Sequence, residues 1–259
     1  MRFFKDLKKY KSYALYAAKS TLRSEVTNSY LDWLWWVLEP FCMMCVYTIV
    51  FGYVFKSKEP NFSVFVYIGV SMWGFFHKTI NGSVKLIKAN KPTISRLYIP
   101  KQILLIIMML VNAFKMMLSF GIIVIMMIYF KISVSWYLLW FVPIMLVFFV
   151  FTYGVGCFIM HYGVYVEDLS YICNIVLKVM MYFTGIFYSI ESRVEGTLKI
   201  ILCDCNPLAL LINSARKSLI YAEGGYGLKL LIWAVISLLI SIAGTRLVYK
   251  NENSYVKVI

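Results

Sequence analysis

The chain has 259 residues, of which 61% are hydrophobic and only 15% charged, and its mean hydropathy is +0.76. Ordinary soluble domains are about 45–50% apolar and about 25% charged, so this composition excludes a soluble enzyme and a disordered chain and indicates an integral membrane protein. The formal net charge is +14, from 26 Lys and Arg against 12 Asp and Glu, which in a membrane protein marks cytoplasmic segments rather than nucleic-acid binding.

Residues 1–30 predict an amphipathic helix with a basic face. Apolar residues in this segment fall mostly three or four positions apart, and Lys and Arg run through its whole length. No apolar core precedes a small-residue cleavage site, which argues against a signal peptide. We expect this helix to lie on the inner leaflet of the membrane, and the alternative is a cytosolic linker helix without membrane contact.

Six stretches of the chain are long and apolar enough to span a membrane. A span needs roughly 20 predominantly apolar residues to cross about 30 Å of hydrocarbon, and its backbone must bond internally, which makes it a helix. The predicted fold is therefore an all-α integral membrane protein with six transmembrane helices. The expected spans are Leu34–Phe55, Phe62–Asn81, Ile103–Phe130, Ser135–Met160, Ile172–Ile190 and Leu228–Tyr249.

The distribution of Lys and Arg predicts the orientation of these spans. The first 33 residues, the segment after the second span and the C-terminal tail are all rich in Lys and Arg. Basic segments face the cytoplasm, so both termini and the loop 82–101 are expected on the cytoplasmic side. An even number of spans agrees with two termini on the same side.

The external segment 191–227 predicts two short helices before the last span. Asn206 is a favoured N-cap residue and Pro207 suits the first helical position, so a helix should begin there. Helices of about 10–15 residues are too short to cross the membrane. We therefore expect a helical hairpin that is either re-entrant or lies on the surface.

The sequence predicts no catalytic residues and no metal site. It contains no phosphate-binding G-x-x-x-x-G-K-(S/T) loop, no C-x-x-C and no H-E-x-x-H, and its two His are isolated. Lys115 lies near the middle of the third span and Glu39 early in the first. Charges within spans often mark function, so Lys115 either lines a conduit or pairs structurally with Glu39 or a backbone carbonyl.

Aromatic residues make up 18% of the chain, and more of them fall within spans than interfacial belts require. Flat apolar rings with polar edges suit the faces of sugar rings, so we interpret part of this set as the lining of a substrate conduit. Ordinary helix packing is the alternative. With Lys115, the candidate conduit residues are Tyr67, Trp73, Phe76, Tyr182, Phe183, Phe187 and Tyr188.

Five segments, in chain order, resemble motifs of the ABC-2-type permeases, in the branch that exports polysaccharides and teichoic acids. Residues 31–40, LDWLWWVLEP, are similar to the L-G-x-L-W-x-x-L-x-P opening of the family's first span. Residues 85–101, ending near Tyr98-Ile99-Pro100, resemble the stretch after its second span. Residues 164–169 are similar to V-x-(F/Y)-R-D-(I/L), residues 185–188 to S-P-I-x-Y, and residues 206–216 to N-P-(L/M) with a downstream Arg. The matching positions include Trp35, Glu39, Pro40, Asp168, Asn206, Pro207 and Arg216.

The resemblance implies a single transmembrane domain over residues 1–259 that is a transport subunit and not itself an enzyme. Such permeases form homodimers in the bacterial cytoplasmic (inner) membrane and bind two copies of a separate ATPase, which holds ATP and Mg. The residues 1–30 would form a gate helix, and a short helix near 82–96 would couple to the ATPase. The substrate would be a glycan of O-antigen, capsule or teichoic acid type on an undecaprenyl-type lipid. The coupling residues would be Lys85, Lys88, Lys91 and Arg96.

Two alternatives stay open from the sequence. One is an ABC-2 permease with the same fold that exports a lipid or a drug through a narrower conduit. The other is a membrane-embedded enzyme acting on lipid-linked sugars, which would need a cluster of acids or histidines at an interface. Only Glu167 and Asp168, with His161 six residues earlier, approach such a cluster.

Overall fold

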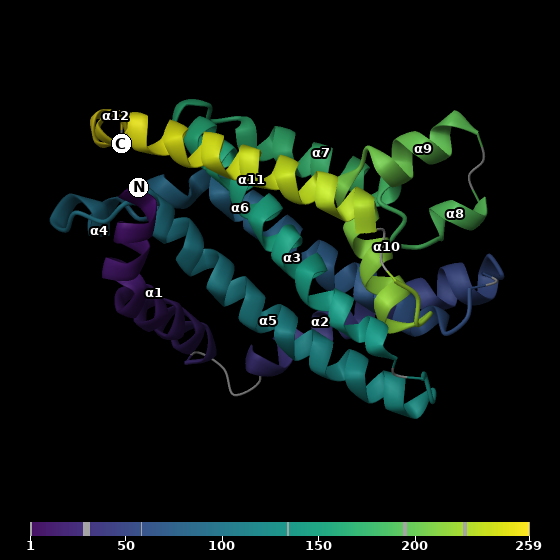
Figure 1. Ribbon diagram of the computed structural model, residues 1–259. Helices are drawn as coiled ribbons and strands as arrows, with labels where there is room; N and C mark the ends of the chain where they lie inside the picture. Colours follow the sequence, from purple (N-terminus) through teal and green to yellow (C-terminus); the bar gives the residue numbers. More distant parts are fainter. Residues whose placement is uncertain are drawn as a thin grey trace.

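The computed structural model describes residues 2–27, 32–57, 59–133, 135–193, 196–224 and 227–258, and every regular element in these ranges is helical (Figure 1). Parts of the predicted segments 1–30 and 191–227 therefore lie outside the described residues. In chain order the elements are α1 (Arg2–Val26), α2 (Asp32–Tyr47), the π-helix η1 (Thr48–Val54), α3 (Phe62–Ala89), α4 (Lys91–Arg96), α5 (Lys101–Tyr129), the 3-10 helix η2 (Trp136–Trp140), α6 (Phe141–Tyr165), α7 (Leu169–Phe183), α8 (Ile190–Arg193), α9 (Thr197–Asp204), α10 (Pro207–Leu219), α11 (Gly227–Lys250) and α12 (Glu252–Val258).

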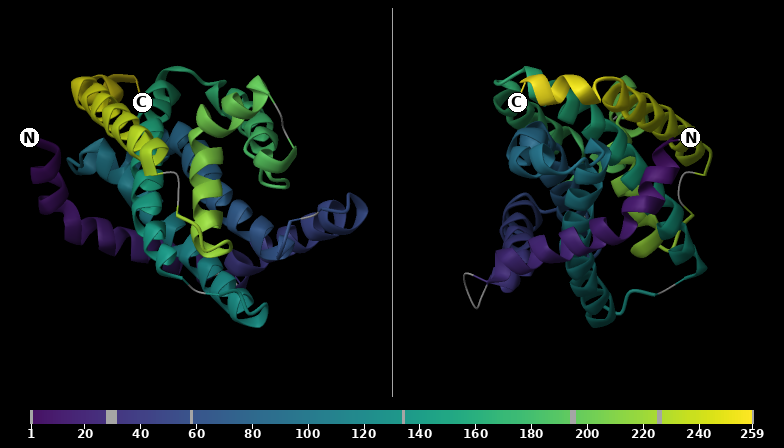
Figure 2. Two further views of the ribbon diagram at one scale, coloured as in Figure 1. Left: turned by 45° about the vertical axis from the view of Figure 1, so that its right-hand side comes forward. Right: turned by 90° about the vertical axis from the view of Figure 1, so that its left-hand side faces the viewer.

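The helix α3 lies at the centre of the bundle. Its side chains are buried along most of its length, from Phe62 to Ile87. It contacts α2, α5, α6, α7 and α10, while α11 packs on the far side of α6 (Figure 2). The main hydrophobic core forms where these helices meet. The arrangement places three helices, α2, α5 and α7, around one side of α3.

Glycines on α6 allow its two neighbours to approach closely. A Cβ atom added at Gly163 would lie 2.1 Å from the carbonyl oxygen of Val84 on α3. One added at Gly154 would lie 2.9 Å from the backbone nitrogen of Ser241 on α11. Small residues at helix contacts allow such backbone packing, which is a main source of helix association in membranes.

We expect the substitution Gly163→Ala to destabilise the protein by about 1–3 kcal/mol, because the backbone of α3 must move to admit a methyl group. The matched control is Gly121→Ala on α5, where an added Cβ would meet nothing within 4 Å. Thermal unfolding in detergent should show a lower midpoint for the first variant and an unchanged or higher one for the second. Equal midpoints for the two variants would contradict the close contact of α6 with α3.

Four helical stretches are long and apolar enough to cross a membrane by length and composition: Trp33–Val54, Lys101–Tyr129, Trp136–Tyr165 and Gly227–Lys250. Their bounds match those of four of the predicted spans to within a few residues at each end. The predicted second and fifth spans correspond to α3 and α7, which are not among the four. The helix α3 is long enough but carries Ser71, His77, Lys78 and Thr79 within its apolar sequence, and α7 has only 15 residues.

The predicted fifth span, Ile172–Ile190, is wrong at its C-terminal end, because α7 stops at Phe183. The hydroxyl of Thr184 donates a hydrogen bond back to the carbonyl of Met180, at 2.6 Å. Gly185 then has a φ of +67°, in the left-handed region that favours glycine. The chain therefore leaves the helix at this point and turns across the bundle before α8 begins.

The short helices predicted before the last span are present as α9 and α10, and the helix after Asn206 begins as expected. The side-chain oxygen of Asn206 accepts hydrogen bonds from the backbone nitrogens of Leu208, at 3.1 Å, and Ala209, at 3.3 Å, with Pro207 in the first turn. Ten of the 13 residues of α10 are buried, so the alternative of a surface-lying helix is wrong for α10. At the end of α10, the Tyr221 hydroxyl donates to Glu59, at 2.8 Å, and burial raises the pKa of Tyr221.

Both termini lie at the same end of the bundle, beside α4 (Figure 1). Arg2 forms an ion pair with Glu252, at 2.9 Å, and also contacts the hydroxyl of Tyr98, which donates to Glu252, at 3.0 Å. The hydroxyl of Tyr249 donates to Asp6, at 2.7 Å. These contacts join α1, the connection between α4 and α5, and the two C-terminal helices into one polar cluster.

Candidate functional site

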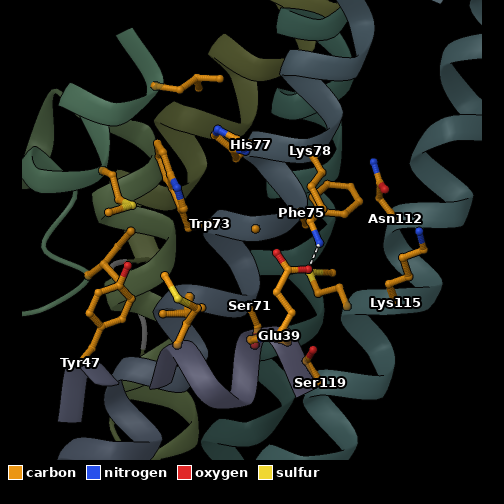
Figure 3. Close-up of a pocket in the computed structure, with 18 of the residues that line it drawn as sticks. Glu39, Tyr47, Ser71, Trp73, Phe75, His77, Lys78, Asn112, Lys115 and Ser119 are labelled. Carbon is orange, nitrogen blue, oxygen red and sulfur yellow. Dashed lines mark hydrogen bonds and ion pairs between the residues drawn. The ribbon is translucent and has the colours of Figure 1, made fainter. Parts of the chain in front are cut away.

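A cleft of about 250 Å³ opens beside α3, between α2, α5 and α7 (Figure 3). Trp36 and Glu39 reach it from α2, Trp73 and Lys78 from α3, and further residues from α5 and α7. The cleft combines charged and aromatic side chains, which sets it apart from the mostly apolar surfaces of the surrounding helices. We therefore take it as the candidate functional site.

Ion pairs and cations form one part of the cleft. The Nζ atom of Lys78 lies 2.8 Å from a carboxylate oxygen of Glu39, and both side chains are about half exposed (Figure 3). Lys178 lines the same cleft from α7. Asn112 from α5 also faces it and donates a hydrogen bond to the hydroxyl of Thr79, at 3.1 Å.

Lys115 enters the cleft from α5 and is held by residues of two other helices. Its Nζ atom lies 2.6 Å from a carboxylate oxygen of Glu25, in the last turn of α1. The same atom lies 5.2 Å from the centre of the Trp36 ring, within the range of a cation–π contact. The Lys115 side chain is 19% exposed and Glu25 is 37% exposed, so the pair sits at the rim of the cleft.

Aromatic rings form the other part of the cleft, from Trp36, Tyr47, Trp73, Phe75 and Phe187. The rings of Tyr47 and Phe187 lie 4.4 Å apart between centroids, which joins the end of α2 to the turn after α7. Such pairs contribute about 0.5–1.5 kcal/mol beyond the area they bury. Ring contacts therefore hold this part of the cleft together.

The structure divides the predicted conduit residues into two groups. Trp73, Lys115 and Phe187 line the cleft. The other five do not: Tyr67 and Phe76 are buried in the core, Tyr182 and Phe183 are exposed, and the Tyr188 hydroxyl donates to the Tyr182 carbonyl, at 2.9 Å. Spacing along a helix locates its faces, but only the packing of α3 decides which face is covered by protein.

The alternative in which Lys115 pairs with Glu39 is wrong, because each has another partner. Glu39 pairs with Lys78 and Lys115 with Glu25. Sequence analysis did not single out Glu25 or Trp36 as site residues. A signal was present, since Glu25 is one of only two acids in the basic segment 1–30 and lies at the end of the amphipathic helix.

The predicted coupling residues lie on two helices. Lys85 and Lys88 belong to the last turns of α3, because that helix continues to Ala89 instead of ending in a loop. Lys91 and Arg96 are exposed and lie on α4, the short helix that follows. Lys88 lies 3.9 Å from Glu167 in the turn between α6 and α7, so the two turns are neighbours at this end of the bundle.

The motif positions also separate into different roles. Glu39 and Pro40 line the cleft, whereas Trp35 is 56% exposed and is not among the lining residues. Asp168 precedes α7 without a capping hydrogen bond from its side chain. Arg216 is a buried residue of α10, and its guanidinium donates hydrogen bonds to backbone carbonyls of α3 and of the turn after α7. Arg216 therefore supports the wall of the cleft without lining it.

Comparison with known proteins identifies the chain's relatives. The family described as ABC-2 type transporter matches residues 16–220, a range that contains every helix lining the cleft. An O-antigen export system permease protein RfbA of Myxococcus xanthus is 22% identical over 214 residues, which make up 83% of this chain and 82% of the relative. Two proteins of the same name from Klebsiella pneumoniae are each 24% identical, over 196 and 199 residues, covering 75% and 76% of this chain and 75% of each relative.

Proposed function

The chain belongs to the ABC-2 type transporter family, and we propose that it is the permease subunit of an ATP-driven exporter of lipid-linked polysaccharide. The observation that carries the proposal is the likeness to three proteins named as O-antigen export system permeases. That likeness covers at least 75% of this chain and of each relative. In this role the chain moves a glycan on an undecaprenyl-type lipid from the inner to the outer leaflet.

The proposed topology has six spans in the bacterial cytoplasmic membrane, with both termini in the cytoplasm. It adds α3 and α7 to the four helices that are long and apolar enough on their own. The helix α3 is covered by neighbouring helices, so it needs less apolar surface than a helix facing lipid. The termini and α4 meet at one end of the bundle, and the positive-inside rule favours the cytoplasm for this basic end.

The proposed assembly is a homodimer with two copies of a separate ATPase, which binds ATP and Mg. The sequence contains no phosphate-binding loop of its own, so the energy for transport has to come from a partner. The cleft, at about 250 Å³, is smaller than the roughly 300–1,000 Å³ typical of sites for drug-sized ligands. A polymer therefore needs a wider passage, which a second copy of the chain would help to form.

Depletion of this chain in its native host tests the proposal. Surface polysaccharide should disappear while lipid-linked polymer accumulates inside the cell. Inactivating the phosphate-binding lysine of the partner ATPase should give the same phenotype, and restoring the wild-type chain should reverse it. Normal surface polysaccharide after depletion, or accumulation of a different lipid or drug, would overturn the assignment to polysaccharide export.

A further inference from the structure

We propose that the cleft is a binding site for a phosphate-type anion, the phosphate or diphosphate headgroup of a polyprenyl lipid. Lys78, Lys115 and Lys178 would bind it, and Glu25 and Glu39 would act as internal counter-ions that the headgroup displaces. This inference rests on the proposed export function, because it names the part of the exported lipid that the cleft binds.

Three lysines from three different helices converge on this one cleft. Lys78 comes from α3, Lys115 from α5 and Lys178 from α7, and all three line the same space. Among the residues that the structure describes, Lys178 has no carboxylate within ion-pair distance. Three cations against two carboxylates leave the site with one excess positive charge, which favours an anionic ligand.

The Lys78–Glu39 ion pair is weak enough to exchange, and the Lys115–Glu25 pair lies at the partly exposed rim of the cleft. The Lys78 and Glu39 side chains are 48% and 59% exposed, and pairs of this kind contribute only about 0–1 kcal/mol to stability. A phosphate carries more charge and more acceptor oxygens than a carboxylate and forms stronger charge-assisted hydrogen bonds with lysine. A diphosphate can therefore replace Glu39 on Lys78 and Glu25 on Lys115 and also engage Lys178.

The surroundings of the cleft favour a lipid headgroup over a soluble anion. On the helices beside the charged residues, apolar side chains outside the cleft lining are exposed, including Val46 of α2 and Val176 and Val179 of α7. A polyprenyl chain can lie against such surfaces while its headgroup reaches the lysines. The volume of about 250 Å³ also suits a headgroup better than a glycan repeat.

Displacement of Glu25 would couple headgroup binding to the position of α1. Glu25 belongs to the last turn of α1, and its pair with Lys115 ties that turn to α5. A headgroup that binds Lys115 in place of Glu25 breaks the ion pair between α1 and α5. By linkage, any change that weakens the Glu25–Lys115 pair should strengthen headgroup binding to the same extent.

The test measures binding of undecaprenyl diphosphate to the purified complex of this chain and its ATPase in nanodiscs. Undecaprenol and inorganic pyrophosphate are the two comparison ligands. The substitutions Lys115→Met and Lys178→Met should each weaken binding of the diphosphate lipid about tenfold or more, as expected for the loss of a charged hydrogen-bonding group. Glu25→Gln and Glu39→Gln should strengthen it about two- to fivefold, because they free a lysine.

The pair formed by Lys229 and Asp204, at 2.7 Å, provides the matched control, because it lies outside the cleft. Lys229→Met and Asp204→Asn should leave binding unchanged. A gain of affinity in the Glu variants cannot result from misfolding, which keeps the test decisive if the Lys variants are unstable. Thermal unfolding of each variant is measured alongside binding.

Four results would overturn the inference: binding unchanged in the Lys variants, weaker binding in the Glu→Gln variants, equal binding of undecaprenol, or pyrophosphate binding as tight as that of the lipid. The last would leave an anion site but contradict its assignment to a lipid headgroup. Normal surface polysaccharide after depletion, with headgroup binding intact, would overturn the proposed export function and leave the binding site standing.

Discussion

The substitution Arg216→Ala should remove most of the folded protein from the membrane. Arg216 is only 2% exposed, and its guanidinium donates to three backbone carbonyls, those of Phe65, at 3.0 Å, Gly185, at 2.8 Å, and Ile186, at 2.9 Å. The group also stacks on the Phe65 ring, 3.5 Å from its centre. One side chain thus fastens α10 to the start of α3 and to the turn after α7.

Alanine at position 216 would leave three carbonyls without their donor and open a cavity between these segments. Each unsatisfied buried group costs about 1–3 kcal/mol, against a total stability of about 5–15 kcal/mol for a typical protein. Arg216→Lys keeps the positive charge but loses the planar guanidinium, whose N–H groups donate in fixed directions. The variant should therefore retain only part of the stability of the wild-type protein. Arg246→Ala, at an exposed position on α11, is the matched control.

The measurements are the amount of protein in membranes and the thermal unfolding midpoint in detergent. We expect the order wild type and Arg246→Ala, then Arg216→Lys, then Arg216→Ala, with export lost in the last because the cleft wall is no longer held. An Arg216→Ala variant that accumulates and unfolds like wild type would show that the three hydrogen bonds contribute little.

The elements predicted best from the sequence are those set by local signals. The helix α3 begins at Phe62, as the apolar run predicts, and α10 begins at the Asn206-Pro207 pair. Capping residues and apolar length act within a few positions along the chain, so they can be recognised without knowing the fold. The same holds for the amphipathic helix α1 and for the last span, α11.

The predictions that failed depend on residues far apart in the chain. The end of α7 at Phe183 is fixed partly by Arg216, which binds the carbonyls of Gly185 and Ile186 from about 30 positions away. The continuation of α3 to Ala89 places Val84 against Gly163 of α6, a contact between residues about 80 positions apart. No local pattern marks such contacts, because they arise from tertiary packing.

The ion pairs of the cleft also could not be predicted from local sequence patterns. The sequence identified Lys115 and Glu39 as unusual charges within spans, but their partners could not be found by spacing alone. Lys115 meets Glu25 only because α1 folds back along α5. Spacing likewise could not show that Tyr67 is buried in the core and does not line the cleft.

Charge reversal on α4, in the double variant Lys91→Glu and Arg96→Glu, should release the ATPase subunit from the purified permease. The helix α4 extends from the end of the bundle that holds both termini (Figure 1). Half-buried Ile94 anchors it to the cluster of Ala14, Ile99, Ile103 and Leu104, while Lys91 and Arg96 are exposed. An anchored, exposed basic helix is suited to enter an acidic groove on a partner.

The expected loss of copurifying ATPase is about tenfold or more, because placing like charges against each other across an interface costs several kcal/mol. Folding should be unaffected, since substitutions at exposed positions usually change stability by no more than about 0.5 kcal/mol. The control, Lys8→Glu with Lys11→Glu, reverses the same number of charges at exposed positions of α1. If the α4 variant retained its ATPase as well as this control does, α4 would not be the coupling element, and the basic residues of this end would serve only to orient the chain in the membrane.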